Sequence, residues 1–126
     1  MRLLLDTNII IRLRRGERQL DDRTRRNLRS AAAVYVSAAS IWEIAMKKSG
    51  RKLDVEINGL EERLLEAGFE QLPITWIHAR RAHDIAPFHP DPFDRLLLAQ
   101  AICEPLHLLT SDQHLAQYAQ GLVIEV

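Results

Sequence analysis

Short apolar runs alternate along this chain with segments long enough to form helices, and no other feature constrains the fold as much. Residues 3–5 are a continuous Leu-Leu-Leu run, which is typical of a strand buried on both faces. Further strands are expected at residues 34–36, 70–74, 107–110 and 122–125. Because parallel strands need crossover connections of helix length, the pattern predicts a three-layer α/β/α domain whose central, mainly parallel sheet has about five strands.

Apolar periodicity and capping residues predict helices between these strands. One helix begins at about Thr7 and stops near Gly16. Another is capped by Ser37 or Ser40 and ends near Gly50. The remaining helices are expected at residues 20–30, 57–68, 75–85 and 93–102, with a short one that ends near residue 120.

The length and composition limit the class of protein. The 126 residues suit a single domain that spans 1–126. No apolar run approaches the roughly 20 residues of a membrane span, and residues 1–6 are too short for a signal peptide. The one cysteine excludes an internal disulfide and suits the reducing cytosol. We therefore expect a cytoplasmic protein with no membrane partner.

Arginine is concentrated in one part of a chain whose formal net charge is zero. Residues 12, 14, 15, 18, 23, 25, 26 and 29 are all arginines. Arginine forks bind phosphate and carboxylate groups with two parallel hydrogen bonds, so the segment favours a phosphate-bearing or acidic partner. A solvated helical face explains the same pattern, and both interpretations stay open.

Four acidic residues are expected at one edge of the predicted sheet. Asp6 follows the first strand, Glu43 lies early in the helix after the second strand, and Asp112 follows the strand that ends at Thr110. Asp94 joins them if its helix, which follows a proline-rich loop, begins at the same edge. Open α/β sheets bind ligands beyond the carboxyl ends of their strands, so these acids are candidates for one site.

Each acid also has a structural explanation. Asp6 can cap a helix, Glu43 can close a capping box with the serine three residues before it, and Asp112 can complement a helix dipole. Asp91 can be the cap that precedes Asp94. Four crowded carboxylates raise one another's pKa unless a cation neutralises them, and we expect no nearby lysine to do so. A divalent cation such as Mg²⁺ or Mn²⁺, which prefers oxygen ligands, meets this need.

Carboxylates that hold such a cation can support hydrolysis of a phosphodiester, because the metal activates water and braces phosphate oxygens. The sequence offers no Ser-His-Asp or Cys-His arrangement and no glycine-rich phosphate loop. The five histidines lack the spacing of a zinc site. Metal-assisted hydrolysis is therefore the predicted chemistry.

Five segments of the chain resemble, in order, the motifs of the PIN-domain family, and within it the VapC-type ribonuclease toxins of bacterial toxin–antitoxin modules. They are LLDTN at 4–8, VSAASIWEIA at 36–45, LPIT at 72–75, DPFDRLLLAQA at 91–101 and LTSD at 109–112. One such segment alone would be weak, whereas the ordered set spans nearly the whole chain.

The resemblance implies a Mg²⁺- or Mn²⁺-dependent endoribonuclease that acts on tRNA or ribosomal RNA. It implies a homodimer, and inhibition by a cognate antitoxin that binds over the active site. Asp6, Glu43 and Asp94 match the family's metal-binding acidic positions, and Asp112 matches a fourth, more variable one. Some relatives carry another acid where His114 stands here, so a second metal is in doubt.

Other residues are expected near this site. The resemblance implies that Thr7 or Asn8, and Thr110, support the carboxylates through hydrogen bonds. Arg95 either contacts phosphate or pairs with an acid, and His89 either touches substrate or belongs to a surface loop. Trp42 and Trp76 occupy helical positions where packing is expected, with stacking on RNA bases as the alternative.

Two rival functions were weighed against the nuclease. A signalling receiver domain shares the length and the acidic pocket, but such domains carry a lysine near their last strands, and no lysine follows Lys52 here. A catalytically silent PIN-like module that binds RNA or protein would be indicated by loss of a central acid, and none is lost. Sequence alone leaves this second alternative open.

Overall fold

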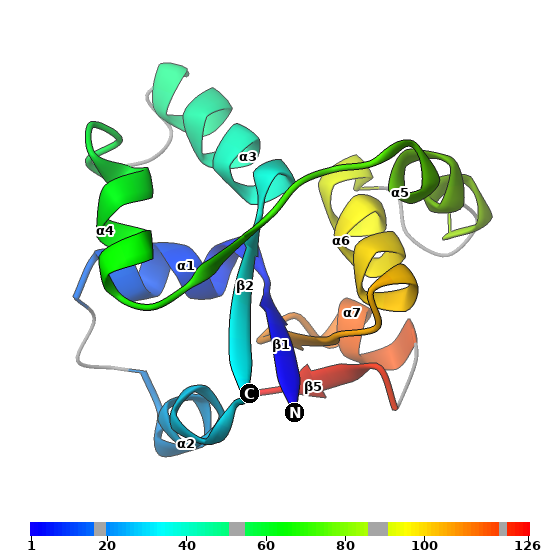
Figure 1. Ribbon diagram of the computed structural model, residues 1–126, viewed down its shortest axis with the longest axis horizontal. Helices are drawn as coiled ribbons and strands as arrows, with labels where there is room; N and C mark the ends of the chain where they lie inside the picture. Colours follow the sequence, from blue (N-terminus) through cyan, green and yellow to red (C-terminus); the bar gives the residue numbers. More distant parts are fainter. Residues whose placement is uncertain (17–19, 51–54, 86–90, 119–120) are drawn as a thin grey trace.

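Five parallel strands form the centre of the fold (Figure 1). The computed structural model describes residues 1–16, 20–50, 55–85, 91–118 and 121–126. The strand order is β3-β2-β1-β4-β5, and every neighbouring pair is parallel. The strands are β1 Arg2–Leu5, β2 Ala33–Ser37, β3 Glu70–Leu72, β4 His107–Thr110 and β5 Val123–Glu125. The predicted parallel sheet of about five strands is confirmed.

Helices cover both faces of this sheet, as the three-layer prediction requires. They are α1 Thr7–Arg14, α2 Asp22–Ser30, α3 Ala38–Ser49, α4 Leu60–Glu66, α5 Trp76–Arg81, α6 Pro92–Cys103 and α7 Gln113–Tyr118, with a 3₁₀ helix η1 at Ala82–Ile85. In Figure 1, α1 and α4 lie on one side of the sheet and α6 and α7 on the other.

The first strand shows why the sheet is buried on both faces. Leu3 and Leu5 pack into the cluster beneath α1 and α4, whereas Leu4 packs into the cluster beneath α6 and α7. All three leucines are almost completely buried. A continuous apolar run is therefore required here, because side chains along a strand alternate between its faces.

The predicted element boundaries differ from the observed ones mainly at helix and strand ends. The strand predicted at 70–74 stops at Leu72, because Pro73 has no N–H to continue the ladder. Ser37, rather than Ser40, caps α3 by accepting the N–H of Ala39 at 3.0 Å. The helix predicted at 57–68 begins only at Leu60. The helix predicted at 75–85 becomes 3₁₀ after Arg81.

No helix in the described part of the chain is both long and apolar enough to cross a membrane. Of the proline-rich loop predicted at residues 87–92, residues 87–90 with His89 lie outside the described residues, whereas Pro92 is the first residue of α6.

Candidate active site

The parallel strands end at one edge of the sheet, where the helices α1 and α3 begin (Figure 1), and the predicted acids follow these strand ends or lie on helices near them. Asp6 connects β1 to α1, and its own backbone N–H donates to the carbonyl of Leu109 on β4 at 3.0 Å. Asp112 comes two residues after the end of β4. Glu43 projects from α3, which follows β2 directly, and Asp94 lies in the first turn of α6.

Thr110 organises the side of the site formed by β1 and β4. Its hydroxyl donates to Oδ2 of Asp6 at 2.6 Å and accepts the backbone N–H of Asp112 at 3.0 Å. One hydroxyl therefore fixes both the orientation of a buried carboxylate and the loop after β4. Asp6 is only 3% exposed. Burial raises the pKa of Asp6, and the nearby charges of Glu43 and Asp112 add to this, while the hydrogen bonds from Thr110 and Thr7 oppose it.

Glu43 has a partner that the sequence interpretation missed. Nζ of Lys47 lies 2.9 Å from Oε2 of Glu43, one helical turn further along α3. The expectation that no nearby lysine neutralises these acids was therefore wrong, since positions i and i+4 of a helix face each other. The capping-box explanation of Glu43 is also wrong, because α3 begins at Ala38. Glu43 instead lies in the second turn, only 7% exposed.

Asp94 carries the largest electrostatic perturbation in the described part of the chain. Its helix is capped by Asp91, whose Oδ1 accepts the backbone N–H groups of Phe93 at 2.8 Å and Asp94 at 3.3 Å. The capping role considered for Asp91 is thus present. Partial burial raises the pKa of Asp94 to about 8, and the negative charges of Asp6, Asp91, Glu43 and Asp112 contribute.

Asp112 is less buried and has a local role as well. Its Oδ1 accepts the backbone N–H of His114 at 2.8 Å, so it sits at the start of α7. Its charge nevertheless raises the pKa of both Asp6 and Asp94. The four predicted acids therefore share one electrostatic environment, although they come from widely separated parts of the sequence.

The four carboxylates supply the oxygen ligands that a divalent cation prefers, but their side chains are not arranged as a ready metal site. Among the described residues, no three His, Cys, Asp or Glu side chains are grouped so that they could hold a metal ion. The salt bridge with Lys47 holds Glu43. The raised pKa values of Asp6 and Asp94, however, mark two carboxyl groups whose ionisation is disfavoured by burial and by neighbouring negative charges, and a bound cation would favour their ionised forms.

The predicted supporting residues differ in their contacts. The Thr7 hydroxyl donates to Oγ of Ser40 at 2.9 Å and so ties α1 to α3, while the Thr7 backbone hydrogen-bonds the Asp6 carboxylate. Asn8 is exposed at the second position of α1. Arg95 is partly buried beside Asp94 in the sequence. Thr110 supports Asp6 directly through its side-chain hydroxyl.

A buried polar network behind the site was not predicted. Gln100, in the middle of α6, accepts the Ser37 hydroxyl through Oε1 at 2.5 Å, and its Nε2 donates to the carbonyl of Pro73 at 3.3 Å. The same Nε2 lies 3.4 Å from Nδ1 of His78, which also accepts the N–H of Thr75. Nδ1 of His78 is therefore an acceptor, so the neutral imidazole ring carries its proton on its own Nε2.

The other end of His78 completes this network. Its Nε2 lies 2.5 Å from a carboxylate oxygen of Glu104, at the end of α6. Ser37 also caps α3, which carries Glu43, while α6 carries Asp94. The network thus joins the two helices that bear acids of the site. A glutamine within an otherwise apolar stretch of α6 is the only sequence signal of it.

The predicted packing role was wrong for Trp76, which is exposed, whereas Trp42 is partly exposed and packs through one aromatic contact. Trp76 is 94% exposed at the start of α5. Trp42 is 57% exposed and meets Phe93 edge to face, with 5.2 Å between ring centroids. This contact joins α3 to the first turn of α6, beside Glu43 and Asp94 in the sequence.

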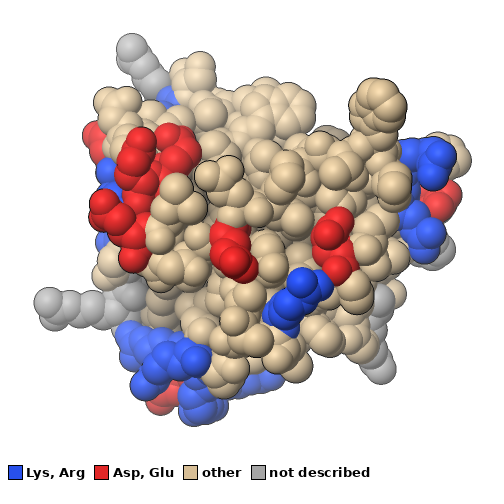
Figure 2. All heavy atoms as spheres, in the orientation of Figure 1, with Lys and Arg blue, Asp and Glu red and all other residues tan. Residues whose placement is uncertain are grey.

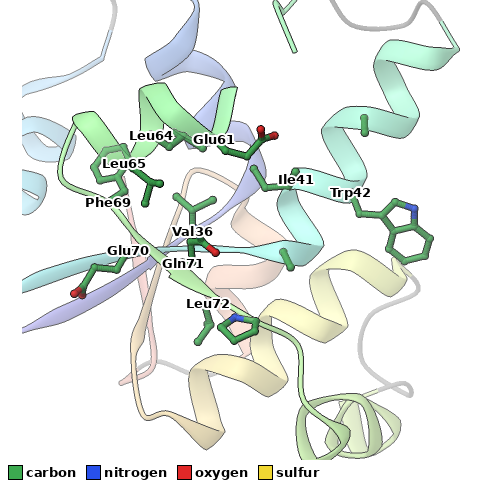
Figure 3. A pocket seen from close by; sticks show the side chains of 13 residues that line it. Val36, Ile41, Trp42, Glu61, Leu64, Leu65, Phe69, Glu70, Gln71 and Leu72 are labelled. Atoms are coloured by element: carbon green, nitrogen blue, oxygen red, sulfur yellow. The ribbon is translucent and has the colours of Figure 1, made fainter. Parts of the chain in front are cut away.

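An apolar groove of about 420 Å³ lies between α3, α4 and β3 (Figure 3). Ile41 and Trp42 line it from α3, Leu64 and Leu65 from α4, and Phe69 from the segment before β3. Two acids, Glu61 and Glu70, also line it. The groove shares Trp42 with the neighbourhood of the acids but contains none of the four.

Similarity to solved structures extends over almost the whole chain. A toxin–antitoxin complex from Klebsiella pneumoniae aligns with a TM-score of 0.71 and 22% identity, covering 98% of this chain and 99% of that one. FitAcB from Neisseria gonorrhoeae gives a TM-score of 0.69 and 25% identity over 98% and 96% of the two chains. VapBC2 from Rickettsia felis, bound to a DNA fragment from its promoter, aligns with a TM-score of 0.71 and 14% identity, covering 99% of this chain and 98% of that one.

No curated protein sequence matches the chain significantly. The PIN domain family, in contrast, matches residues 3–121, which is nearly the full length. PIN domains are generally nucleases, and PIN nucleases typically use divalent metal ions. The motifs, the sheet order and this match agree, and the chain belongs to the PIN domain family.

Proposed function

We propose that this protein is a Mg²⁺- or Mn²⁺-dependent endoribonuclease that hydrolyses phosphodiester bonds in tRNA or ribosomal RNA. The observation that carries the proposal is the raised pKa of two electrostatically coupled carboxyl groups, the buried Asp6 and the partly buried Asp94. A divalent cation would allow both to ionise at neutral pH. Such a substrate places the activity in the cytoplasm, with residues 1–126 acting as one domain.

Asp6, Glu43 and Asp94 would hold the cation, and Asp112 would assist. When bound, the cation would activate water and brace phosphate oxygens. Thr110 keeps Asp6 oriented through its hydroxyl. To join the ligand set, Glu43 would have to break its salt bridge with Lys47. That salt bridge pairs a half-exposed ammonium group with a nearly buried carboxylate.

Residues near the acids have supporting roles in this proposal. Thr7 positions α1 against α3 through Ser40, and thereby relates Asp6 to Glu43. Asn8 is exposed one residue further along α1 and can meet the substrate. Arg95 provides a guanidinium next to Asp94, suited to a phosphate or to an acid of the site.

RNA cleavage by Asp6→Asn tests the site. The variant is expected to lose cleavage by at least about 100-fold, because a positioned metal ligand is removed while the Thr110 hydrogen bond can persist to the amide. Asp84→Asn, which changes an exposed acid on η1, is the matched control. Equal cleavage by both variants, in preparations free of other nucleases, would reject the assignment of Asp6.

The similarity to solved structures that include a toxin–antitoxin complex supports a toxin role. We place the apolar side chains of a cognate antitoxin in the groove of Figure 3. Trp42 links that groove to the acids, so a bound segment can extend over the active site. Leu65→Glu should weaken capture of the product of a small adjacent reading frame, whereas Ala67→Glu at the end of α4 should not. Undiminished capture by Leu65→Glu would exclude the groove.

A homodimer is the proposed assembly of the toxin. Trp76 and Ile77, which are both exposed at the start of α5, offer the large apolar side chains that buried interface cores favour. Light scattering should give twice the chain mass for the unmodified protein and the single mass for Trp76→Ala with Ile77→Ala. A dimer that survives this double change would place the interface elsewhere.

The alternative is a catalytically silent PIN-like module that binds RNA or protein. The salt bridge between Glu43 and Lys47 favours it, since an acid already neutralised has less need of a metal. The two functions differ in one measurement. RNA binding without any cleavage at millimolar Mn²⁺, by the unmodified protein, would select the silent module.

A further inference from the structure

One face of α2 is rich in arginine. With about 100° between successive helical residues, Arg25, Arg29, Arg26 and Arg23 fall in that order within an arc of about 160°, which they share with Asp22 and Ser30. Thr24 and Leu28 lie on the opposite side. Thr24 is buried and Leu28 packs against the hydrophobic core, whereas all four arginines are exposed. We call these four residues the arginine face. Figure 2 shows basic side chains gathered over α2 at the lower left.

The positive charges of the arginine face repel one another, and these exposed side chains gain no core packing that would offset the repulsion. Arg25 and Arg29 are four residues apart, and Arg26 is three residues from both Arg23 and Arg29. Like charges at these spacings destabilise a helix by about 0.2–0.5 kcal/mol per pair. Asp22 meets Arg25 at 3.7 Å, but both side chains are substantially exposed. Only Arg29, in the last turn, complements the helix dipole.

The arginine face lacks the side chains that a protein partner would bury. Among the nine residues of α2 the only apolar side chain is Leu28, which is turned toward the core. Hot spots of protein interfaces combine arginine with buried aromatic side chains, which α2 does not offer, whereas a nucleic-acid backbone can be bound through phosphate contacts alone. Arginine forks match phosphate oxygens with two hydrogen bonds. The chemistry therefore favours a polyphosphate backbone over an acidic protein.

The arginine face and the proposed active site lie at opposite ends of the strands. α2 leads into the start of β2, and Ala32 just after it donates to the carbonyl of Met1 at 2.7 Å, before β1. The acids follow the other ends of the strands. A strand of four residues such as β1 spans roughly 13 Å. A few nucleotides in the active site would not reach α2, but a folded RNA would.

We infer that the arginine face of α2 is a second docking surface for the phosphate backbone of a large, folded RNA whose cleaved segment enters the acidic site. This rests on the proposed ribonuclease function. Arg12 extends the face from α1, since its charge reaches the carboxylate of Asp21 at the cap of α2. The surface would select substrates by size and shape, because phosphate contacts carry no base sequence.

The test measures binding of bulk tRNA at several salt concentrations, with Asp6→Asn present throughout so that RNA stays intact. Replacing two phosphate contacts by Arg23→Gln with Arg26→Gln should make the plot of log affinity against log salt shallower by about 1.4 to 1.8. A rise from 50 to 200 mM salt would then weaken binding about tenfold less than in the parent. Arg80→Gln with Arg81→Gln, on exposed residues of α5, is the control of equal charge and should keep the parental slope.

Further measurements distinguish failure of the docking surface from failure of the proposed ribonuclease function. With Asp6 restored, cleavage of a six-nucleotide single strand should be unchanged by the α2 substitutions, whereas cleavage of tRNA at low enzyme should fall about tenfold. An unchanged slope, or an equal change in the α5 control, would overturn the docking surface. Loss of binding to a ten-residue glutamate peptide with unchanged tRNA binding would also overturn it, in favour of an acidic protein. Absence of cleavage by the unmodified protein would count against the ribonuclease function only.

Discussion

If the proposed cation binds at the four acids, its binding should release protons, and the pKa of Asp94 determines how many of them come from that residue. A carboxyl group with a pKa of about 8 is about 90% protonated at pH 7. A metal ligand must be ionised, so binding of Mn²⁺ at pH 7 should expel about 0.9 proton from Asp94. Asp6, whose pKa is also raised, adds to this number. At pH 9 the release from Asp94 should fall to about 0.1 proton.

The same pKa fixes the direction of two pH dependences. Mn²⁺ affinity should rise by about tenfold per pH unit between pH 6 and 7.5 and level off above pH 8. Without metal, protonated Asp94 stabilises the fold at low pH, and this contribution is lost as the pH rises from about 4 through about 8. Allowing for partial exposure to solvent, the loss should be about 2–3 kcal/mol.

Calorimetric titration with MnCl₂ in two buffers of different ionisation enthalpy measures the proton count directly. The release at pH 7 should be close to one proton or more for the unmodified protein and for the control Asp84→Asn. Asp94→Asn should bind more weakly and release fewer protons. Binding with less than about 0.2 proton released at pH 7, and with an affinity independent of pH, would refute the argument that burial and crowding keep Asp94 protonated.

Three further substitutions probe the neighbours of the acids. Thr110→Val removes both hydrogen bonds of the hydroxyl, so it should cost about 1–3 kcal/mol of unfolding free energy and reduce RNA cleavage. Lys47→Met leaves Glu43 nearly buried without its cation, so thermal unfolding should show a lower melting temperature and a larger increase on adding Mn²⁺. Gln100→Leu strands the serine and histidine that contact it, and chemical denaturation should show a loss of about 1–3 kcal/mol.

Each of these has an outcome that would contradict its reasoning. Unchanged cleavage by the threonine variant would show that Asp6 is oriented without the hydroxyl. A smaller metal-induced increase in the lysine variant would mean that the ammonium assists metal binding rather than competing with it. Unchanged stability of the glutamine variant would show that water or a rearranged side chain satisfies the same groups.

The strands and the acidic edge could be predicted because each depends on local sequence and on one topological rule. The run at residues 3–5 specifies a strand buried on both faces, and parallel topology then brings Asp6 and Asp112 to one edge. Lys47 was within reach of the same reasoning, since it lies four residues from Glu43 on one helix.

The buried network and the exposed tryptophans could not be predicted in the same way. Gln100 meets Ser37 and Pro73 across 63 and 27 residues of sequence, and nothing local to α6 specifies those partners. Trp76 occupies a helical position, yet which side of a short helix faces the core depends on how η1 and α6 pack against it. Helical spacing indicates that a face exists but does not say which neighbour covers it.

The negative charge of the acids is compensated in two different ways, which bears on how the proposed cation would bind. A salt bridge with the Lys47 ammonium group compensates Glu43, whereas the raised pKa of Asp94 favours its protonated form at neutral pH. The proposed divalent cation would therefore have to displace both the proton of Asp94 and the ammonium group of Lys47. Metal affinity should depend on pH through Asp94 and on side-chain rearrangement through Glu43, so the two effects can be separated by combining Asp94→Asn with Lys47→Met.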